Sequence, residues 1–256
     1  MSTTSKDAAP SAWTQPARMI WRVLYGLYAW IIFIVLALSA LCTALLPGVH
    51  RRRRAARGAA RVLLRLAGLR LTVKSEERIP DAQCVIVANH ASYLDGVVFT
   101  AVLPPRFGFI IKREMNRVPL AGLLLRRLGS LFVERFNPQR GANDARRVLR
   151  TAISGSSLVF FPEGTFTTAP GLLKFHVGAF TAAARAGCPV VPAVVRGTRQ
   201  VFPLGAFFPR RAHIEVEFLP PLIASTAAGE SVAAELRDRA RSAILARLEE
   251  PDLAAA

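Results

Sequence analysis

The chain is poor in cysteine, in lysine and in acidic residues. Its three cysteines, Cys42, Cys84 and Cys188, form no CxxC pair and have no metal-ligand spacing, so they predict buried thiols rather than disulfides or a zinc site. Reduced thiols are typical of a compartment that faces the cytosol. Only 17 acidic residues stand against 34 basic ones, four of them lysine, and the net charge is +17. Such an excess attracts a polyanion: nucleic acid, anionic lipid or an acidic carrier protein.

Recognisable DNA- or RNA-binding motifs are also absent, which weakens nucleic acid as the partner. Hydrophobic residues make up 52% of the 256 residues, and the mean hydropathy is +0.32. This composition excludes a largely disordered chain. The length accommodates one α/β domain together with a membrane-contacting segment.

The N-terminal part predicts a membrane-associated segment of two helices, residues 17–70, after a disordered tail, residues 1–16. Residues 23–46 contain no charged side chain and are long enough to span a bilayer. The run is also longer than the apolar core of a cleavable signal peptide. Residues 50–70 predict a basic amphipathic helix on an anionic membrane surface, or a helix that packs on the domain. The arginines would place residues 50–256 in the cytoplasm, unless the two helices dip into one leaflet as a hairpin.

From residue 71 onward, short apolar runs alternate with helical stretches, and we interpret residues 71–256 as one catalytic domain. This alternation predicts an α/β fold with a mainly parallel central sheet flanked by helices. The predicted strands are 71–74, 83–88, 107–111, 130–133, 157–161, 189–195 and 213–219. The predicted helices are 93–103, 116–127, 139–154, 175–187 and 229–249.

Ligands of open α/β folds bind where strands end, and the first such junction is CVIVANHASYLDG, residues 84–96. A strand delivers Asn89 and His90, and a turn leads to Asp95 in the first turn of the next helix. A carboxylate on one imidazole nitrogen fixes the tautomer and leaves the other nitrogen as a general base. Because the nucleophile motif GxSxG is absent, the base would act on a substrate hydroxyl. Taken alone, His and Asp at this spacing are equally typical of an unrelated surface pair.

The second junction is SLVFFPEGTFTTAPG, residues 157–171, where a buried strand ends in Glu163, Gly164 and Thr165. Gly164 permits close backbone approach, and Thr165 offers a hydroxyl and an amide to an anion. An ordinary strand-to-loop turn would give the same pattern. Of the remaining histidines, His176 and His213 are expected to be structural or solvent-facing, and His50 belongs to the basic run.

Four ordered motifs together resemble the glycerolipid acyltransferase family, which makes phosphatidate from 1-acyl-glycerol-3-phosphate. They are NHASYLD (89–95), GSLFVER (129–135), FPEGT (161–165) and VVPAVVRG (190–197). The resemblance covers about residues 70–220. It implies that His90 is the general base and that Asp95 orients it. It also implies that Asn89 orients the turn at His90 and that Arg135 contacts the phosphate of the acceptor. The acceptor site would be shaped by Glu163, Gly164 and Thr165. Lys112, at a strand end, is a further phosphate candidate on the sequence alone.

One position departs from the family pattern. An arginine that binds phosphate often follows EGT, and this chain has Phe166. Lys174 or Arg135 would have to compensate. Otherwise the acceptor is another lysolipid, such as a lyso-ornithine lipid or another lysophospholipid.

The resemblance implies acyl transfer from acyl carrier protein or coenzyme A, with no metal or prosthetic group, on the cytoplasmic face of a bacterial inner membrane. The expected partners are therefore membrane lipids, a lysophospholipid acceptor and an acyl thioester, with no nucleic acid. Leucines 120, 123, 124 and 125 would line an acyl tunnel or simply fill the core. Two alternatives remain: a non-enzymatic lipid-binding scaffold, in which His90 is dispensable, and a membrane-tethered nucleic-acid binder built on residues 50–70.

Overall fold

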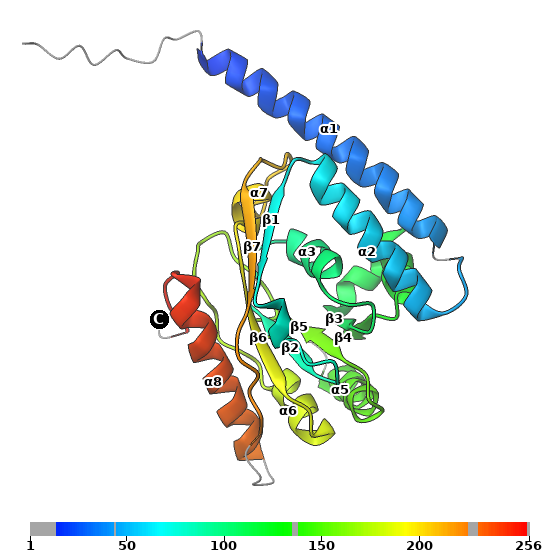
Figure 1. Cartoon of the computed structure of the whole chain (residues 1–256), viewed down its shortest axis with the longest axis vertical. Coiled ribbons are helices and arrows are strands. Elements are labelled where there is room, and N and C mark those ends of the chain that lie inside the picture. The colour runs from blue at the N-terminus through cyan, green and yellow to red at the C-terminus, as the bar shows by residue number, and fades with distance from the viewer. Residues whose placement is uncertain (1–13, 44, 135–137, 225–229, 255–256) are drawn as a thin grey trace, which may run out of the picture.

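The fold is a seven-stranded sheet with helices on both faces, seen in a computed structural model (Figure 1). The structure describes residues 14–43, 45–134, 138–224 and 230–254. The strand order is β1-β7-β6-β2-β5-β3-β4, and only the pair β6 and β7 is antiparallel. The strands are β1 (Arg70–Lys74), β2 (Val85–Ala88), β3 (Gly108–Lys112), β4 (Leu131–Val133), β5 (Leu158–Phe160), β6 (Val190–Arg196) and β7 (His213–Phe218). All seven predicted strands and the mainly parallel sheet are confirmed.

Two apolar layers cover the sheet. One layer packs α2 (Val49–Leu66) and α3 (Leu94–Val102) against one face, and the other packs α5 (Pro138–Ile153), α6 (Gly178–Ala186) and α8 (Glu230–Leu248) against the opposite face. The strand β2 lies between β5 and β6, and all four of its residues are buried. This is the burial expected for a continuous apolar run in a parallel sheet covered on both sides.

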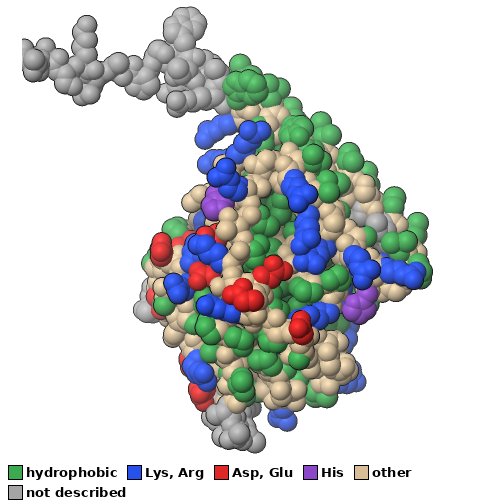
Figure 2. Space-filling view, in the orientation of Figure 1, with side chains coloured by type: hydrophobic (Ala, Val, Ile, Leu, Met, Phe, Trp, Pro, Cys, Tyr) green, Lys and Arg blue, Asp and Glu red, His purple; other side chains and the backbone are tan. Residues whose placement is uncertain are grey.

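The two N-terminal helices form a hairpin across the domain (Figure 1). The first, α1 (Thr14–Thr43), contains a stretch from Met19 to Ser39 that is long and apolar enough to cross a membrane. Its side chains are mostly exposed, and Figure 2 shows hydrophobic side chains along its outer face. Residues 1–13, most of the predicted tail, lie outside the described residues.

The second helix, α2, packs on the domain through buried alanines and leucines, as one of the two interpretations predicted. Four of its arginines bond backbone carbonyls of the domain: Arg52 to Arg127, Arg53 to Leu128, Arg57 to Val102 and Arg61 to Ala101. These carbonyls lie at helix ends, where partial negative charge accumulates and cations are stabilising. Part of the basic run therefore holds the hairpin to the domain. Arg51, Arg54 and Arg65 remain exposed.

The predicted helix 116–127 is wrong as a single element. The segment contains a short 3-10 helix, η2 (Arg113–Arg117), and then α4 (Ala121–Arg127). Pro119 separates them, because a residue before proline is driven out of the helical region, and Val118 is extended. Two short elements were not predicted, η1 (Glu76–Arg78) and α7 (Thr198–Val201).

Candidate active site

The site lies at the carboxyl ends of β2 and β5, which are neighbours in the sheet. Asn89 and His90 follow β2, and Glu163 to Thr165 follow β5 after Phe161 and Pro162. The sheet thus brings together two motifs that are about 70 residues apart in the chain. Lys112 ends β3, on the far side of β5, and lies at the same edge.

His90 and Asp95 form the predicted pair. The distance from His90 Nδ1 to Asp95 Oδ2 is 2.7 Å, and Asp95 is fully buried. The same oxygen accepts the backbone N–H groups of Ala91 at 2.7 Å and Ser92 at 2.9 Å. Because a carboxylate only accepts, Nδ1 is the protonated nitrogen. Nε2 is then left with a lone pair, as a general base requires.

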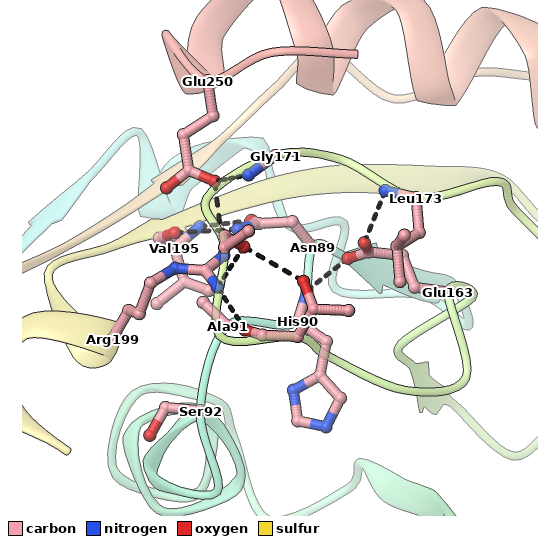
Figure 3. A network of polar contacts seen from close by, with 12 residues as sticks. Asn89, His90, Ala91, Ser92, Glu163, Gly171, Leu173, Val195, Arg199 and Glu250 are labelled. Atoms are coloured by element: carbon pink, nitrogen blue, oxygen red, sulfur yellow. Dashed lines mark hydrogen bonds and ion pairs between the residues drawn. The ribbon is translucent and has the colours of Figure 1, made fainter. Parts of the chain in front are cut away.

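The backbone of His90 is fixed by Glu163, which lies on the neighbouring strand end (Figure 3). Glu163 Oε1 accepts the His90 N–H at 2.6 Å, and Oε2 accepts the Leu173 N–H at 2.8 Å. Burial raises the pKa of this carboxyl to about 7, the nearby Asp95 adds to the increase, and the two N–H donors oppose it. With both oxygens occupied by backbone donors, Glu163 positions His90.

Asn89 is likewise a positioning residue. Its side-chain amide donates to the Val195 carbonyl at 2.9 Å and accepts the Val195 N–H at 2.8 Å (Figure 3). The side chain is 2% exposed, so both of its polar atoms are used in joining the end of β2 to β6. This geometry agrees with the expected orienting role and leaves Asn89 no surface for a substrate.

Aromatic rings surround the imidazole. Phe161 stacks on His90 with ring centroids 4.4 Å apart, and Phe166 meets it edge-on at 4.5 Å. Tyr93 in turn contacts Phe166 at 4.8 Å. Phe161 and Tyr93 were not predicted, although each lies inside a recognised motif. The base therefore works in an apolar environment, and Phe166 lies in direct contact with it.

A cavity of about 550 Å³ opens at His90 between the sheet and the helical hairpin. Its lining is mostly apolar and comes from α1, α2, α3, α4, β3 and the loop after β5. Leu124 and Leu125 contribute to the wall, whereas Leu120 and Leu123 are exposed. The leucine-rich segment is therefore part of the cavity wall rather than core, and Gly164, Thr165 and Phe166 lie at the same cavity.

Cationic groups at the cavity are few. Arg53 and Lys112 line it, and the Arg53 guanidinium is engaged by the carbonyls of Leu128, Arg106 and Gly129. Lys112 is the only lining cation without such a partner within the described ranges. Lys174 is exposed and is not part of the wall, so its predicted contact with the acceptor finds no support. Arg135 lies outside the described residues.

The loop after Gly164 is held by the C-terminal segment. Glu250 accepts the Gly171 N–H at 2.6 Å and pairs with Arg199 at 3.3 Å (Figure 3). Leu172 exchanges backbone hydrogen bonds with Pro251 and Leu253. A side chain at Gly171 would collide with Leu253, so the close approach requires glycine. No motif in the sequence predicted this contact.

The other histidines and two of the three cysteines agree with their predictions, whereas Cys42 is exposed on α1 and the prediction of a buried thiol is wrong there. His176 and His213 are exposed, and His213 bonds Thr72 at 2.8 Å. Cys84 and Cys188 are buried and free, and burial raises the pKa of the Cys84 thiol to about 11.

Comparison with known proteins identifies the family. The model of the acyltransferase family matches residues 70–196, which contain the His90–Asp95 pair and the FPEGT segment. The chain belongs to the acyltransferase family. This confirms the resemblance that the four motifs indicated.

Two relatives and one solved structure are similar to this chain. The chloroplast 1-acyl-sn-glycerol-3-phosphate acyltransferase BAT2 of Brassica napus is 34% identical over 52% of this chain and 39% of its own. The lysophospholipid acyltransferase LPEAT1 of Arabidopsis thaliana is 35% identical over 46% of this chain and 30% of its own. The chain thus spans less than half the length of these two relatives. The crystal structure of the 1-acyl-sn-glycerophosphate acyltransferase PlsC from Thermotoga maritima covers 91% of this chain and 96% of its own, with a TM-score of 0.76 and 22% identity. At this identity the likeness shows a shared fold.

Proposed function

We propose that the protein transfers a fatty acyl group from an acyl thioester to the free hydroxyl of 1-acyl-glycerol-3-phosphate, forming phosphatidate. The observation that carries the proposal is the 2.7 Å contact between His90 and Asp95 at an apolar cavity of about 550 Å³. A base beside an apolar cavity suits a reaction between two lipid substrates.

The reaction needs one proton to move twice. His90 Nε2 takes the proton of the acceptor hydroxyl while its oxygen attacks the thioester carbonyl, and Asp95 stabilises the imidazolium that forms. The C–S bond then breaks, the thiolate leaves and receives the proton from His90. The products are an ester and a free thiol, so no further reactant is required. The thiol belongs to acyl carrier protein or coenzyme A.

The cavity supports binding of an acyl chain. Its wall is made of apolar side chains from the hairpin and from α3 and α4, and each buried methylene contributes about 0.8 kcal/mol. A chain in this cavity would hold its carbonyl carbon near His90, because the imidazole is part of the same wall.

Acceptor recognition rests on Lys112 and on the loop after β5. Lys112 lines the cavity and is free to bind a phosphate oxygen, whereas Phe166 contributes no charge next to the base. A phosphomonoester carries up to two charges, and a phosphodiester carries one. A single free lysine with a neighbouring phenylalanine therefore favours a second candidate, a lysophospholipid whose phosphate is a diester. A lyso-ornithine lipid has no phosphate, but its carboxylate presents the same single negative charge to Lys112.

Membrane attachment follows from the hairpin. Tyr25 and Tyr28 of α1 bond the carbonyls of Ala67 and Leu66 at the end of α2, and Trp30 bonds the carbonyl of Phe207. The helix is thus fastened along the domain with its apolar side outward. This arrangement favours a hairpin that lies in one leaflet, with the cavity open to lipid. The arginine-rich sequence of α2 is what favours the cytoplasmic face of a bacterial inner membrane.

An acyl-transfer assay on membranes from a host that expresses the protein tests the proposal. Radiolabelled 1-acyl-glycerol-3-phosphate, lyso-phosphatidylethanolamine and lyso-ornithine lipid would each be offered with acyl carrier protein and coenzyme A thioesters. Phosphatidate formed by the wild type and lost in His90→Ala would support the first acceptor. Product from only the diester or ornithine acceptor would support the second candidate. No product from any acceptor, with confirmed expression, would contradict acyl transfer.

A further inference from the structure

A second hollow, of about 750 Å³, lies away from His90 between the start of α1 and the segment that precedes β7. Its wall contains three arginines, Arg22, Arg210 and Arg211, and the aromatic residues Trp21, Tyr25 and Tyr28. The acyl transfer proposed above uses none of these side chains. The hollow is therefore a candidate for a second binding site.

The arginines of this hollow are not neutralised by the protein. Within the part of the chain that the structure describes, no carboxylate pairs with Arg22, Arg210 or Arg211. Arg211 lies over the Tyr25 ring at 5.0 Å and beside Gly68, which holds its guanidinium at the hollow. Figure 2 shows basic side chains gathered beneath the N-terminal end of α1. Three guanidiniums without a carboxylate partner in one hollow favour an anionic ligand, because arginine binds phosphate oxygens through two parallel hydrogen bonds.

The opposite side of the hollow is amphipathic. Trp21 is 71% exposed and Tyr28 is 46% exposed, and both belong to the apolar stretch that begins at Met19. Tryptophan and tyrosine concentrate where a membrane protein meets the headgroup layer. The exposed apolar side chains of α1 continue from the hollow along the helix. A ligand here would meet positive charge at one end and a lipid-like surface at the other.

We propose that this hollow binds the phosphate headgroup of an anionic membrane phospholipid, with its acyl chains against the outer face of α1. A free phosphate would use the arginines and leave the aromatic and apolar surface uncovered. A phospholipid covers both. The bound lipid would hold this end of the hairpin at the membrane surface, independently of the chemistry at His90.

Binding of a soluble short-chain lipid tests the site without the general attraction of a charged vesicle. Dioctanoyl-phosphatidylglycerol, below its micelle concentration, would be titrated into the purified full-length protein in neutral detergent, with tryptophan fluorescence as the signal. Trp21→Phe identifies the part of the signal that comes from the hollow. Arg210→Gln with Arg211→Gln should weaken that binding about tenfold or more, because each charge-assisted hydrogen bond to phosphate contributes roughly that factor.

The matched control removes two exposed arginines at the other end of the hairpin, Arg51→Gln with Arg54→Gln, and should change the affinity less than about twofold. Arg210→Lys with Arg211→Lys keeps the charge and should retain most of the binding, which separates loss of a ligand contact from misfolding. Equal losses in both glutamine pairs, or no Trp21-dependent signal, would overturn the proposal. Equal binding of dioctanoyl-phosphatidylcholine, or displacement of the lipid by an equal concentration of inorganic phosphate, would overturn the anionic-lipid assignment.

Discussion

Replacing Phe166 by arginine tests how this chain selects its acceptor. Phe166 contacts the His90 ring at 4.5 Å and lines the same cavity as Lys112, so an arginine there would place a second cation beside the base. A charged hydrogen bond to phosphate is worth about 1.5–3 kcal/mol. The ratio of kcat/KM for a phosphomonoester acceptor over a diester acceptor should therefore rise about 10- to 150-fold in Phe166→Arg.

The ratio matters because the substitution also has a cost. The edge contact between Phe166 and the imidazole contributes about 0.5–1.5 kcal/mol, and its loss should slow both reactions alike. Phe166→Leu removes the ring without adding charge and should leave the ratio unchanged. Kinetics of both acceptors with one acyl donor would measure it. A rise in Phe166→Leu equal to that in Phe166→Arg, or no rise in either, would refute the electrostatic reasoning.

Three other perturbations follow from the structure. Burial raises the pKa of Glu163 from 4.5 to about 7, so the folded state binds the carboxyl proton more tightly than the unfolded state does. The free energy of unfolding should therefore fall by up to about 3 kcal/mol as the pH rises from 4.5 to 7. Urea denaturation across this range should show the fall, and Glu163→Gln should flatten it; parallel curves would contradict the assignment. Glu250→Ala removes the bonds to Gly171 and Arg199. It should lower Tm by about 3–6 °C and raise the KM for the acceptor. The control variant Glu249→Ala, at an exposed position, should change neither quantity. A Cβ at Gly96 would meet nothing within 4 Å at the cavity wall, so Gly96→Leu should shift donor preference toward shorter acyl chains in a mixed-donor competition, and an unchanged preference would place the acyl chain elsewhere.

The parts of the fold that could be predicted are those that depend on residues close together in the chain. The strands β2 and β6 are nearly continuous apolar runs, β7 alternates apolar and charged residues, and β2 delivers His90 to the strand end as expected. The His90–Asp95 contact was predictable because five residues bridge one strand-to-helix turn. The break at Pro119 was also predictable, since proline restricts the residue before it. It was missed because the leucine-rich run that follows is typical of one continuous helix.

The rest depends on contacts between distant residues. Glu250 bonds Gly171, which is 79 positions away in the chain, and no short sequence pattern predicts that contact. The basic helix shows the same limit. Its periodicity predicts an amphipathic surface, but it does not reveal that Arg53 and Arg57 bond carbonyls of the domain. Motifs therefore located the chemistry, and the structure was needed to separate positioning residues such as Asn89 from the residues that line the cavity.

The most direct test of the proposed function is acyl transfer by the purified protein with His90 changed conservatively. His90→Gln keeps the size and polarity of the side chain but lacks a basic nitrogen, and Asp95→Asn keeps the shape but lacks the charge. We expect His90→Gln to lower kcat about 10²- to 10⁴-fold with little change in the KM for the acyl donor, and Asp95→Asn to lower it in the same direction. Both variants should remain folded by circular dichroism. Full activity in folded His90→Gln would contradict general-base catalysis by this residue, and with it the central role of the His90–Asp95 pair.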